Sequence, residues 1–220
     1  GMAPEKGVAL PNGFDMSHLK ESPEKEVARN HIEKAFKLDL NNKYLLLTVG
    51  RQVKRKGHAW FIENVLPELQ SDVIYLAIGE GPEHENLKQI VQENSLEEKV
   101  LLVGKQPDEI LRFAYAASDV FIMPNVPVEG DMEGFGIVLL EANLASTPAV
   151  ASDLEGIKDV IANGKNGYKV PVYDHEKFAT KVDHVIENEL EKMSAVSRSF
   201  VTENFSWSHV AEQYISYLRK

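Results

Sequence analysis

The sequence predicts an α/β fold in which a parallel β-sheet is covered by helices on both faces. Short apolar runs alternate with amphipathic stretches along most of the chain. The run 44–49 is apolar throughout, as expected for a strand that is buried on both faces. Repeated strand–helix alternation implies a parallel sheet. Sheets of this kind bind ligands outside the carboxyl ends of their strands.

The first helix is expected to begin at 22–24. Ser22 would cap it, Pro23 suits its first position, and Glu24 places an acid in its first turn. Its packed side is expected to use Val27, Ile32, Ala35 and Phe36, with Ala28 as a further candidate.

The remaining elements follow in regular order after residue 42. Further strands are expected at 73–78, 100–103, 120–123, 149–152 and 168–170. Helices are expected at about 57–69, 83–94, 107–117, 137–145 and 156–162, and helices fill the remainder. Pro148 prevents the 137–145 helix from running on. The whole pattern predicts a parallel sheet with helices on both faces.

Composition excludes several classes of protein. The chain has 220 residues, 43% of them hydrophobic, which is enough for a sizeable core. Its formal charge of −10 argues against a nonspecific nucleic-acid surface. It has no cysteine, and therefore no disulfide or thiolate metal site. It shows no apolar run near the roughly 20 residues that span a bilayer and no signal-peptide pattern. A cytoplasmic protein is expected.

The stretch 129–148 organises the candidate site. It carries Gly130, Gly134 and Gly136 before an apolar helix, with Glu133 at the mouth of that helix and Glu141 further in. A helical rise would put the two carboxylates roughly 12 Å apart. The free N–H groups of the helix N-terminus between them attract phosphate. A nucleotide-sugar suits this layout, although the spacing alone favours the simpler interpretation of a tight turn before an ordinary helix.

Other candidate loops follow the predicted strands. The loop 50–57 places four basic residues between two glycines, which suits phosphate oxygens or, alternatively, a solvated loop. Gly79-x-Gly81 is expected to be a tight turn, and Gly104-Lys105 follows the strand that ends at Val103. The histidines lack metal-ligand spacing, and the sequence assigns no partner to Asp119.

These motifs together resemble the group 1 (family 4) retaining glycosyltransferases, which have the GT-B fold of two Rossmann-like halves. The resemblance therefore implies a Rossmann-like parallel sheet for this chain. The resemblance rests on the order and spacing of Gly50-Arg51…Lys56-Gly57, Gly79-Glu80-Gly81-Pro82, Glu133-Gly134-Phe135-Gly136…Glu141, Pro148-Ala149-Val150-Ala151-Ser152, Gly156-Ile157, Asn163-Gly164…Gly167, Asn204-Phe205-Ser206-Trp207 and Pro11-Asn12-Gly13-Phe14-Asp15. It covers essentially the whole chain.

The resemblance implies a role for each matching residue. Arg51 and Lys56 would neutralise the donor diphosphate as it leaves, and Glu133 would hold hydroxyls of the transferred sugar. Donor binding would further involve Gly50, the nucleobase loop Gly104-Lys105, the phosphate-facing backbone of Gly134, Phe135, Gly136 and Ile137, and Glu141 at the ribose hydroxyls. The donor would be a UDP-, GDP- or ADP-sugar, and neither metal nor cofactor is expected. Retention would follow from attack by the acceptor on the same face of the sugar.

The resemblance also implies a missing half. Residues 1–21 are expected to be the interdomain junction, and 22–220 the donor-binding, C-terminal domain of a GT-B enzyme. The acceptor-binding half would be absent, together with any catalytic base and any peripheral membrane contact. The isolated domain is therefore expected to bind nucleotide but to transfer little sugar. A role in glycan or cell-envelope polysaccharide synthesis follows from the family alone.

Two departures from the family pattern, and two alternatives, stay open. Ser146 stands where the family has glycine, and Glu155 replaces the first of two glycines before Ile157. An acid at 155 favours the alternative of a non-catalytic nucleotide-sugar-binding or regulatory domain. A dinucleotide-dependent oxidoreductase is disfavoured, because the GxGxxG fingerprint is missing after the first strand.

Overall fold

The computed structural model describes residues 12–17, 22–154 and 156–219. Its centre is a six-stranded sheet whose strands are all parallel. The strands are β1 (Tyr44–Val49), β2 (Val73–Ile78), β3 (Val100–Leu102), β4 (Val120–Met123), β5 (Ala149–Ser152) and β6 (Gly167–Val170). The predicted Rossmann-like fold class is therefore confirmed.

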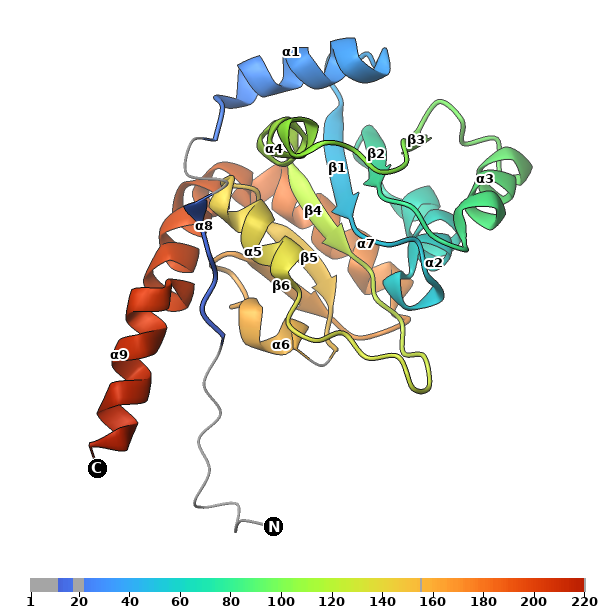
Figure 1. Ribbon diagram of the computed structural model, residues 1–220. Coiled ribbons are helices and arrows are strands. Elements are labelled where there is room, and N and C mark those ends of the chain that lie inside the picture. The colour runs from blue at the N-terminus through green and yellow to red at the C-terminus, as the bar shows by residue number, and fades with distance from the viewer. Residues whose placement is uncertain (1–11, 18–21, 155, 220) are drawn as a thin grey trace.

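Helices connect the strands and cover both faces of the sheet (Figure 1). They are α1 (Lys25–Phe36), α2 (His58–Trp60), α3 (His84–Glu93), α4 (Asp108–Ala117), α5 (Ile137–Leu144), α6 (Ile157–Val160), α7 (His175–His184), α8 (Leu190–Phe205) and α9 (Trp207–Leu218). The helix expected at 57–69 is a mixed segment, in which α2 continues into a π-helical turn, Phe61–Val65, and a 3₁₀ turn, Leu66–Glu68. None of the helices in the described residues is long and apolar enough to cross a membrane.

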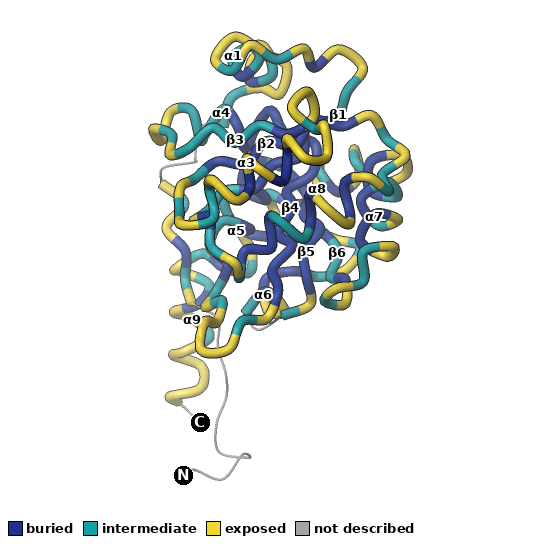
Figure 2. Tube along the Cα trace, turned by 90° about the vertical axis from the view of Figure 1, so that its right-hand side faces the viewer, coloured by how far each residue is buried: buried dark blue, intermediate teal, exposed yellow. Residues whose placement is uncertain are grey.

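Two hydrophobic cores lie on opposite faces of the sheet. One core packs the sheet against α1, α4, α5 and α8, and the other packs it against the 58–68 segment, α3 and α7. Leu45 and Leu47 belong to the first core, whereas Leu46 between them belongs to the second. This division follows from the two-residue period of a strand. Figure 2 shows the strands as the buried centre and α9 as largely exposed.

The predicted start and packed side of the first helix are partly wrong. Helix α1 begins at Lys25, after Glu24, and no side chain caps it, so Ser22 is not its cap. Ala28 and Ile32 are buried, whereas Val27 is 57% exposed and Ala35 is also exposed. Residues 28, 32 and 36 are four apart and therefore share one side of the helix, while positions 27 and 35 are rotated away from it.

The strand order places the candidate loops. The order is β3-β2-β1-β4-β5-β6, so the sheet grows in one direction from β1 and in the other from β4. The connections from β1 and β4 therefore lead to opposite sides of the sheet, although the two strands are neighbours. A crevice at this switch point is where doubly wound sheets bind their ligands.

Candidate functional site

The loops after β1 and β4 lie side by side at the switch point. The Val126 N–H donates to the Arg55 carbonyl at 2.9 Å. Gly57 adopts a left-handed φ of +67°, and a Cβ there would lie 1.9 Å from the Pro124 carbonyl oxygen. Only glycine permits this approach. The basic loop is therefore held directly against the loop that carries Glu133.

One oxygen of Glu133 accepts hydrogen bonds from side chains of both loops. Glu133 Oε2 accepts from Lys56 Nζ at 2.6 Å, from Asn125 Nδ2 at 2.9 Å and from the Arg55 guanidinium. Arg55 Nε also donates to Asp131 at 2.8 Å. We call Arg55, Lys56, Asn125, Asp131 and Glu133 the strand-end cluster.

Charge balance within the cluster sets the state of Glu133. Burial acts to raise the pKa of its carboxyl, but the charge and hydrogen bond of Lys56, the amide of Asn125 and the charge of Arg55 outweigh it and lower the pKa. Burial likewise acts to lower the pKa of Arg55, and its bonds to Asp131 and Glu133 raise it. The cluster therefore holds Glu133 as a carboxylate and Arg55 as a guanidinium cation near neutral pH.

Of the predicted phosphate ligands, Lys56 joins this cluster and Arg51 does not. Lys56 is 8% exposed, and its stem passes beside Gly50, where a Cβ would lie in ordinary contact 3.4 Å from Lys56 Cε. The Arg51 side chain is exposed and makes no hydrogen bond or ion pair within the described part of the chain. Arg55, which the sequence left without a role, takes the inner position instead.

The N-terminus of α5 presents its backbone as expected. Gly136 caps the helix at a φ of +66°, and no side chain caps the N–H groups of the first turn. A Cβ on Gly134 would meet no atom within 4 Å, so this backbone faces open space. Because α5 begins only at Ile137, Glu133 lies in the loop before it. The separation of roughly 12 Å assumed a continuous helical rise and does not apply.

Glu141 lies apart from the strand-end cluster, in a groove of about 480 Å³. It is half-buried, and its Oε2 accepts from the Tyr115 hydroxyl at 2.7 Å. The groove is lined by Asn12, Gly13, Phe14, Asp15, Phe135, Ile137, Glu141 and Trp207. Phe135, Ile137 and Glu141 were expected at one site, and the fold brings all three together. Pro11 of the junction motif, and Glu155, lie outside the described residues.

The remaining predicted loop lies on the other side of β1. Gly104 has a φ of +68°, and its carbonyl accepts from the Gly79 N–H at 2.8 Å. Lys105 is exposed, and its N–H lies 3.4 Å from a Glu80 oxygen. This loop thus borders the same edge of the sheet without touching the strand-end cluster.

Unpaired buried polar atoms concentrate at the same edge. Gln52 Nε2, His58 Nε2, Asn125 Oδ1 and Ser152 Oγ are buried and have no hydrogen-bond partner among the described residues. They follow or end β1, β4 and β5. Burial lowers the pKa of His58 to about 4, with a smaller contribution from Lys56, so its ring is neutral. Buried polar groups normally find partners, so these atoms add to the reasons for seeking the site at this edge of the sheet.

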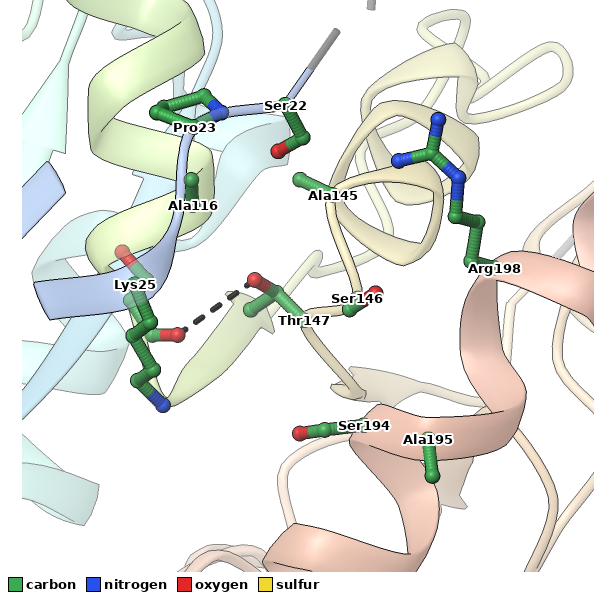
Figure 3. Close-up of a pocket in the computed structure, with 11 residues that line it drawn as sticks. Ser22, Pro23, Lys25, Ala116, Ala145, Ser146, Thr147, Ser194, Ala195 and Arg198 are labelled. Carbon is green, nitrogen blue, oxygen red and sulfur yellow. Dashed lines mark hydrogen bonds between the residues drawn. The ribbon is translucent and has the colours of Figure 1, made fainter. Parts of the chain in front are cut away.

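A second hollow lies at the opposite edge of the sheet (Figure 3). It has a volume of about 430 Å³ and is lined by residues that precede β4 and β5, among them Ser118 and Ser146. Its polar groups are used locally, since Thr147 Oγ1 donates to the Tyr115 carbonyl at 2.6 Å and Arg198 donates to the Leu144 carbonyl at 3.0 Å. It lies at the amino ends of the strands, so we do not place the site there.

The described residues include no group of three or more histidine, aspartate or glutamate side chains that could hold a metal ion. Asp119, which had no partner in the sequence, is a structural anchor: it accepts from Lys25 at 2.6 Å and from Arg29 at 3.0 Å. Metal-independence stays a prediction.

The model of the family "Glycosyl transferases group 1" matches residues 30–199. The chain therefore belongs to the group 1 glycosyltransferase family, as its motifs predict.

Individual relatives agree with this assignment. The chain is 27% identical over 218 residues to the GDP-mannose-dependent alpha-(1-6)-phosphatidylinositol monomannoside mannosyltransferase of Mycobacterium tuberculosis, covering 96% of this chain and 55% of the relative. It is 27% identical over 184 residues to a putative colanic acid biosynthesis glycosyltransferase of Salmonella typhimurium, covering 79% of this chain and 44% of the relative. The chain thus spans about half the length of these curated relatives.

Solved structures confirm the fold. The structure of Anabaena Alr3699/HepE in complex with UDP and glucose superposes with a TM-score of 0.80 at 21% identity, over 100% of this chain and 58% of that one. This likeness concerns the fold of the sheet and its covering helices.

Proposed function

We propose that this chain is the donor-binding domain of a retaining glycosyltransferase that uses a nucleotide-diphospho-sugar. The strand-end cluster carries the proposal, because it sets Lys56 and Arg55 beside Glu133 at the switch point of the sheet. The open α5 N-terminus lies next to it in the chain. Cations and free N–H groups suit a diphosphate, and a carboxylate suits sugar hydroxyls.

The proposed chemistry is stabilisation of a leaving group. The bond between the sugar C1 and the terminal phosphate oxygen breaks, and its electron pair stays on the diphosphate. Lys56 and the exposed Arg51 neutralise the charge that develops there, as preorganised cations do in other enzymes. Glu133 holds the sugar hydroxyls. An acceptor hydroxyl attacks C1 on the face that the diphosphate leaves, and its proton passes to the departing phosphate oxygen. Neither a metal nor a cofactor takes part in this scheme.

The donor and acceptor are proposed only as classes. One relative is named for its use of GDP-mannose and a structural neighbour holds UDP and glucose, so a hexose on UDP, GDP or ADP is the donor class. We assign acceptor binding to the part of a longer protein that corresponds to the unmatched half of the relatives. Glycan or cell-envelope polysaccharide synthesis, on the cytoplasmic side of the membrane, is the proposed setting.

Calorimetric titration with UDP, GDP and ADP, with and without EDTA, tests the proposal. We expect micromolar binding of one nucleotide, unchanged by EDTA. Absence of binding by all three would contradict a donor site in this chain, and loss of binding in EDTA would contradict metal-independence.

Substitutions then test the individual roles. Arg51→Ala should weaken binding of the nucleoside diphosphate but not of the nucleoside, because the substitution removes a phosphate contact only. Lys54→Ala, an exposed lysine in the same loop, is the matched control and should change neither. Glu141→Ala should weaken nucleotide binding by about 1–3 kcal/mol through lost ribose hydrogen bonds, and unchanged affinity in a folded variant would remove that role.

A further inference from the structure

Tyr115 is a buried titratable residue to which the proposed chemistry gives no role. It lies on α4 and is 2% exposed. Its hydroxyl donates to Glu141 Oε2, 2.7 Å away on α5. The bond therefore joins two neighbouring helices at the wall of the groove that Glu141 lines.

Tyr115 is packed on its ring and hydrogen-bonded at its backbone. The Tyr115 ring packs against Phe121 of β4, with ring centroids 5.9 Å apart. Its carbonyl accepts from Thr147 Oγ1 at 2.6 Å. Burial raises the pKa of Tyr115 well above its ordinary value, and the charge of Glu141 adds to this. The phenol therefore stays protonated, and it is the donor in the bond to the carboxylate.

We propose that Tyr115 is a positioning residue that presets the Glu141 carboxylate to receive the two ribose hydroxyls of the nucleotide. The inference rests on the proposed function, in which Glu141 meets the ribose. A carboxylate has about four acceptor positions and the phenol gives one hydrogen, so the Tyr115 bond occupies one of these positions. A glutamate whose rotamer is already set loses less conformational freedom when it binds.

The test compares nucleotides with and without the ribose hydroxyls. Wild type and Tyr115→Phe are titrated with the nucleoside diphosphate that wild type binds and with its 2′,3′-dideoxy analogue. We expect Tyr115→Phe to bind the ribonucleotide about fivefold more weakly, as for the loss of one ordinary hydrogen bond. Binding of the dideoxy analogue, already weak in wild type, should not change. A structural defect would lower the affinity for both ligands equally, and that result would overturn the proposal.

Two further variants complete the design. Tyr168→Phe removes a comparable bond, from the Tyr168 hydroxyl to Glu189 at 2.6 Å, outside the groove, and should leave both affinities unchanged. In a Glu141→Ala background, Tyr115→Phe should cause no additional loss, because the tyrosine acts through Glu141. Additive losses would contradict the positioning role.

Failure of the positioning role can be told apart from failure of the proposed function. If wild type binds no nucleoside diphosphate, the donor site itself is wrong and the role of Tyr115 falls with it. If wild type binds the ribonucleotide better than the dideoxy analogue and Tyr115→Phe keeps that preference in full, only the positioning role is wrong. A cooperative thermal unfolding transition in each variant would show that the variant is folded.

Discussion

Glu133 is the residue on which the strand-end cluster converges, and its ionisation should affect stability. Its pKa in the folded protein lies below the ordinary value of 4.5, because Lys56, Asn125 and Arg55 together outweigh burial. The folded state therefore binds fewer protons than the unfolded state. The stability that Glu133 contributes is fully present above pH 4.5 and is lost as the pH falls through the lowered pKa.

This predicts that Glu133→Gln lowers the free energy of unfolding near pH 6. At about pH 3.5 the difference in this free energy between the variant and wild type should be smaller. Urea unfolding at the two pH values measures the difference in the free energy of unfolding. Glu63→Gln, at an exposed glutamate, is the control and should show no such convergence. A difference for Glu133→Gln that is equal at both pH values would contradict the assigned pKa shift.

Ser146 has a backbone conformation that explains why glycine suits its position. It follows α5 with a φ of +67°. The Ser146 N–H donates to the Asn143 carbonyl and the Thr147 N–H to the Ala142 carbonyl, each at 2.9 Å. This is the left-handed helix ending that glycine adopts at least cost. The departure from the family pattern is therefore expected to affect stability.

We expect Ser146→Gly to raise the free energy of unfolding by about 1 kcal/mol and the melting temperature by about 2–4 °C. Calorimetric or CD melting measures the change. The same substitution at Ser199, an exposed position inside α8, should instead destabilise by about 0.5 kcal/mol. A melting temperature that falls with Ser146→Gly would refute the backbone argument.

Among the larger elements, the loop before α5 depends on the loop after β5 for its shape. A Cβ on Gly156 would lie 1.8 Å from the Gly134 carbonyl oxygen and 3.2 Å from Phe135 Cα. The backbone of 134–135 therefore rests on Gly156. Gly156 thus supports the backbone at which a phosphate is expected.

Gly156→Ala should destabilise the protein by about 1–3 kcal/mol, because one of the two loops must move. It should also weaken nucleotide binding, since the backbone at the α5 N-terminus shifts with the loop. Gly134→Ala adds the same methyl group in open space and should change the free energy of unfolding by less than about 0.5 kcal/mol. Equal melting temperatures for the two variants would contradict this account.

At the scale of the whole molecule, the two cores are coupled through the sheet between them. Strand β1 supplies Leu45 and Leu47 to one core and Leu46 to the other. Neither core can be lost while the strands keep their pairing, so we expect the described domain to unfold as one cooperative unit.

The two tryptophans test this coupling. Trp60 packs against Phe178 beside one core, whereas Trp207 borders the groove on the other side. Melting followed by fluorescence in Trp60→Phe and in Trp207→Phe should give, in each variant, the same midpoint as CD within about 2 °C. Separate midpoints would show that the two faces unfold independently.

The sequence by itself determined the fold class and the edge of the sheet at which to look for a site. Apolar periodicity is local, so runs such as 44–49 predict buried strands without knowledge of their neighbours. Parallel connections then place every loop that follows a strand at the same edge. Gly57 and Gly136 stand in the predicted loops, but only the structure shows that both have the left-handed backbone that favours glycine.

Only the tertiary structure decided which side chains meet. Arg51 and Arg55 are equivalent in the sequence of the basic loop, yet the 3₁₀ turn Lys54–Lys56 brings Arg55 to Glu133, 78 residues further along the chain. In the sequence, nothing distinguishes Tyr115 from an ordinary core residue of α4. In the structure, α5 places Glu141 at its hydroxyl. Side-chain direction depends on irregular backbone angles and on partners distant in the chain, and local periodicity carries neither.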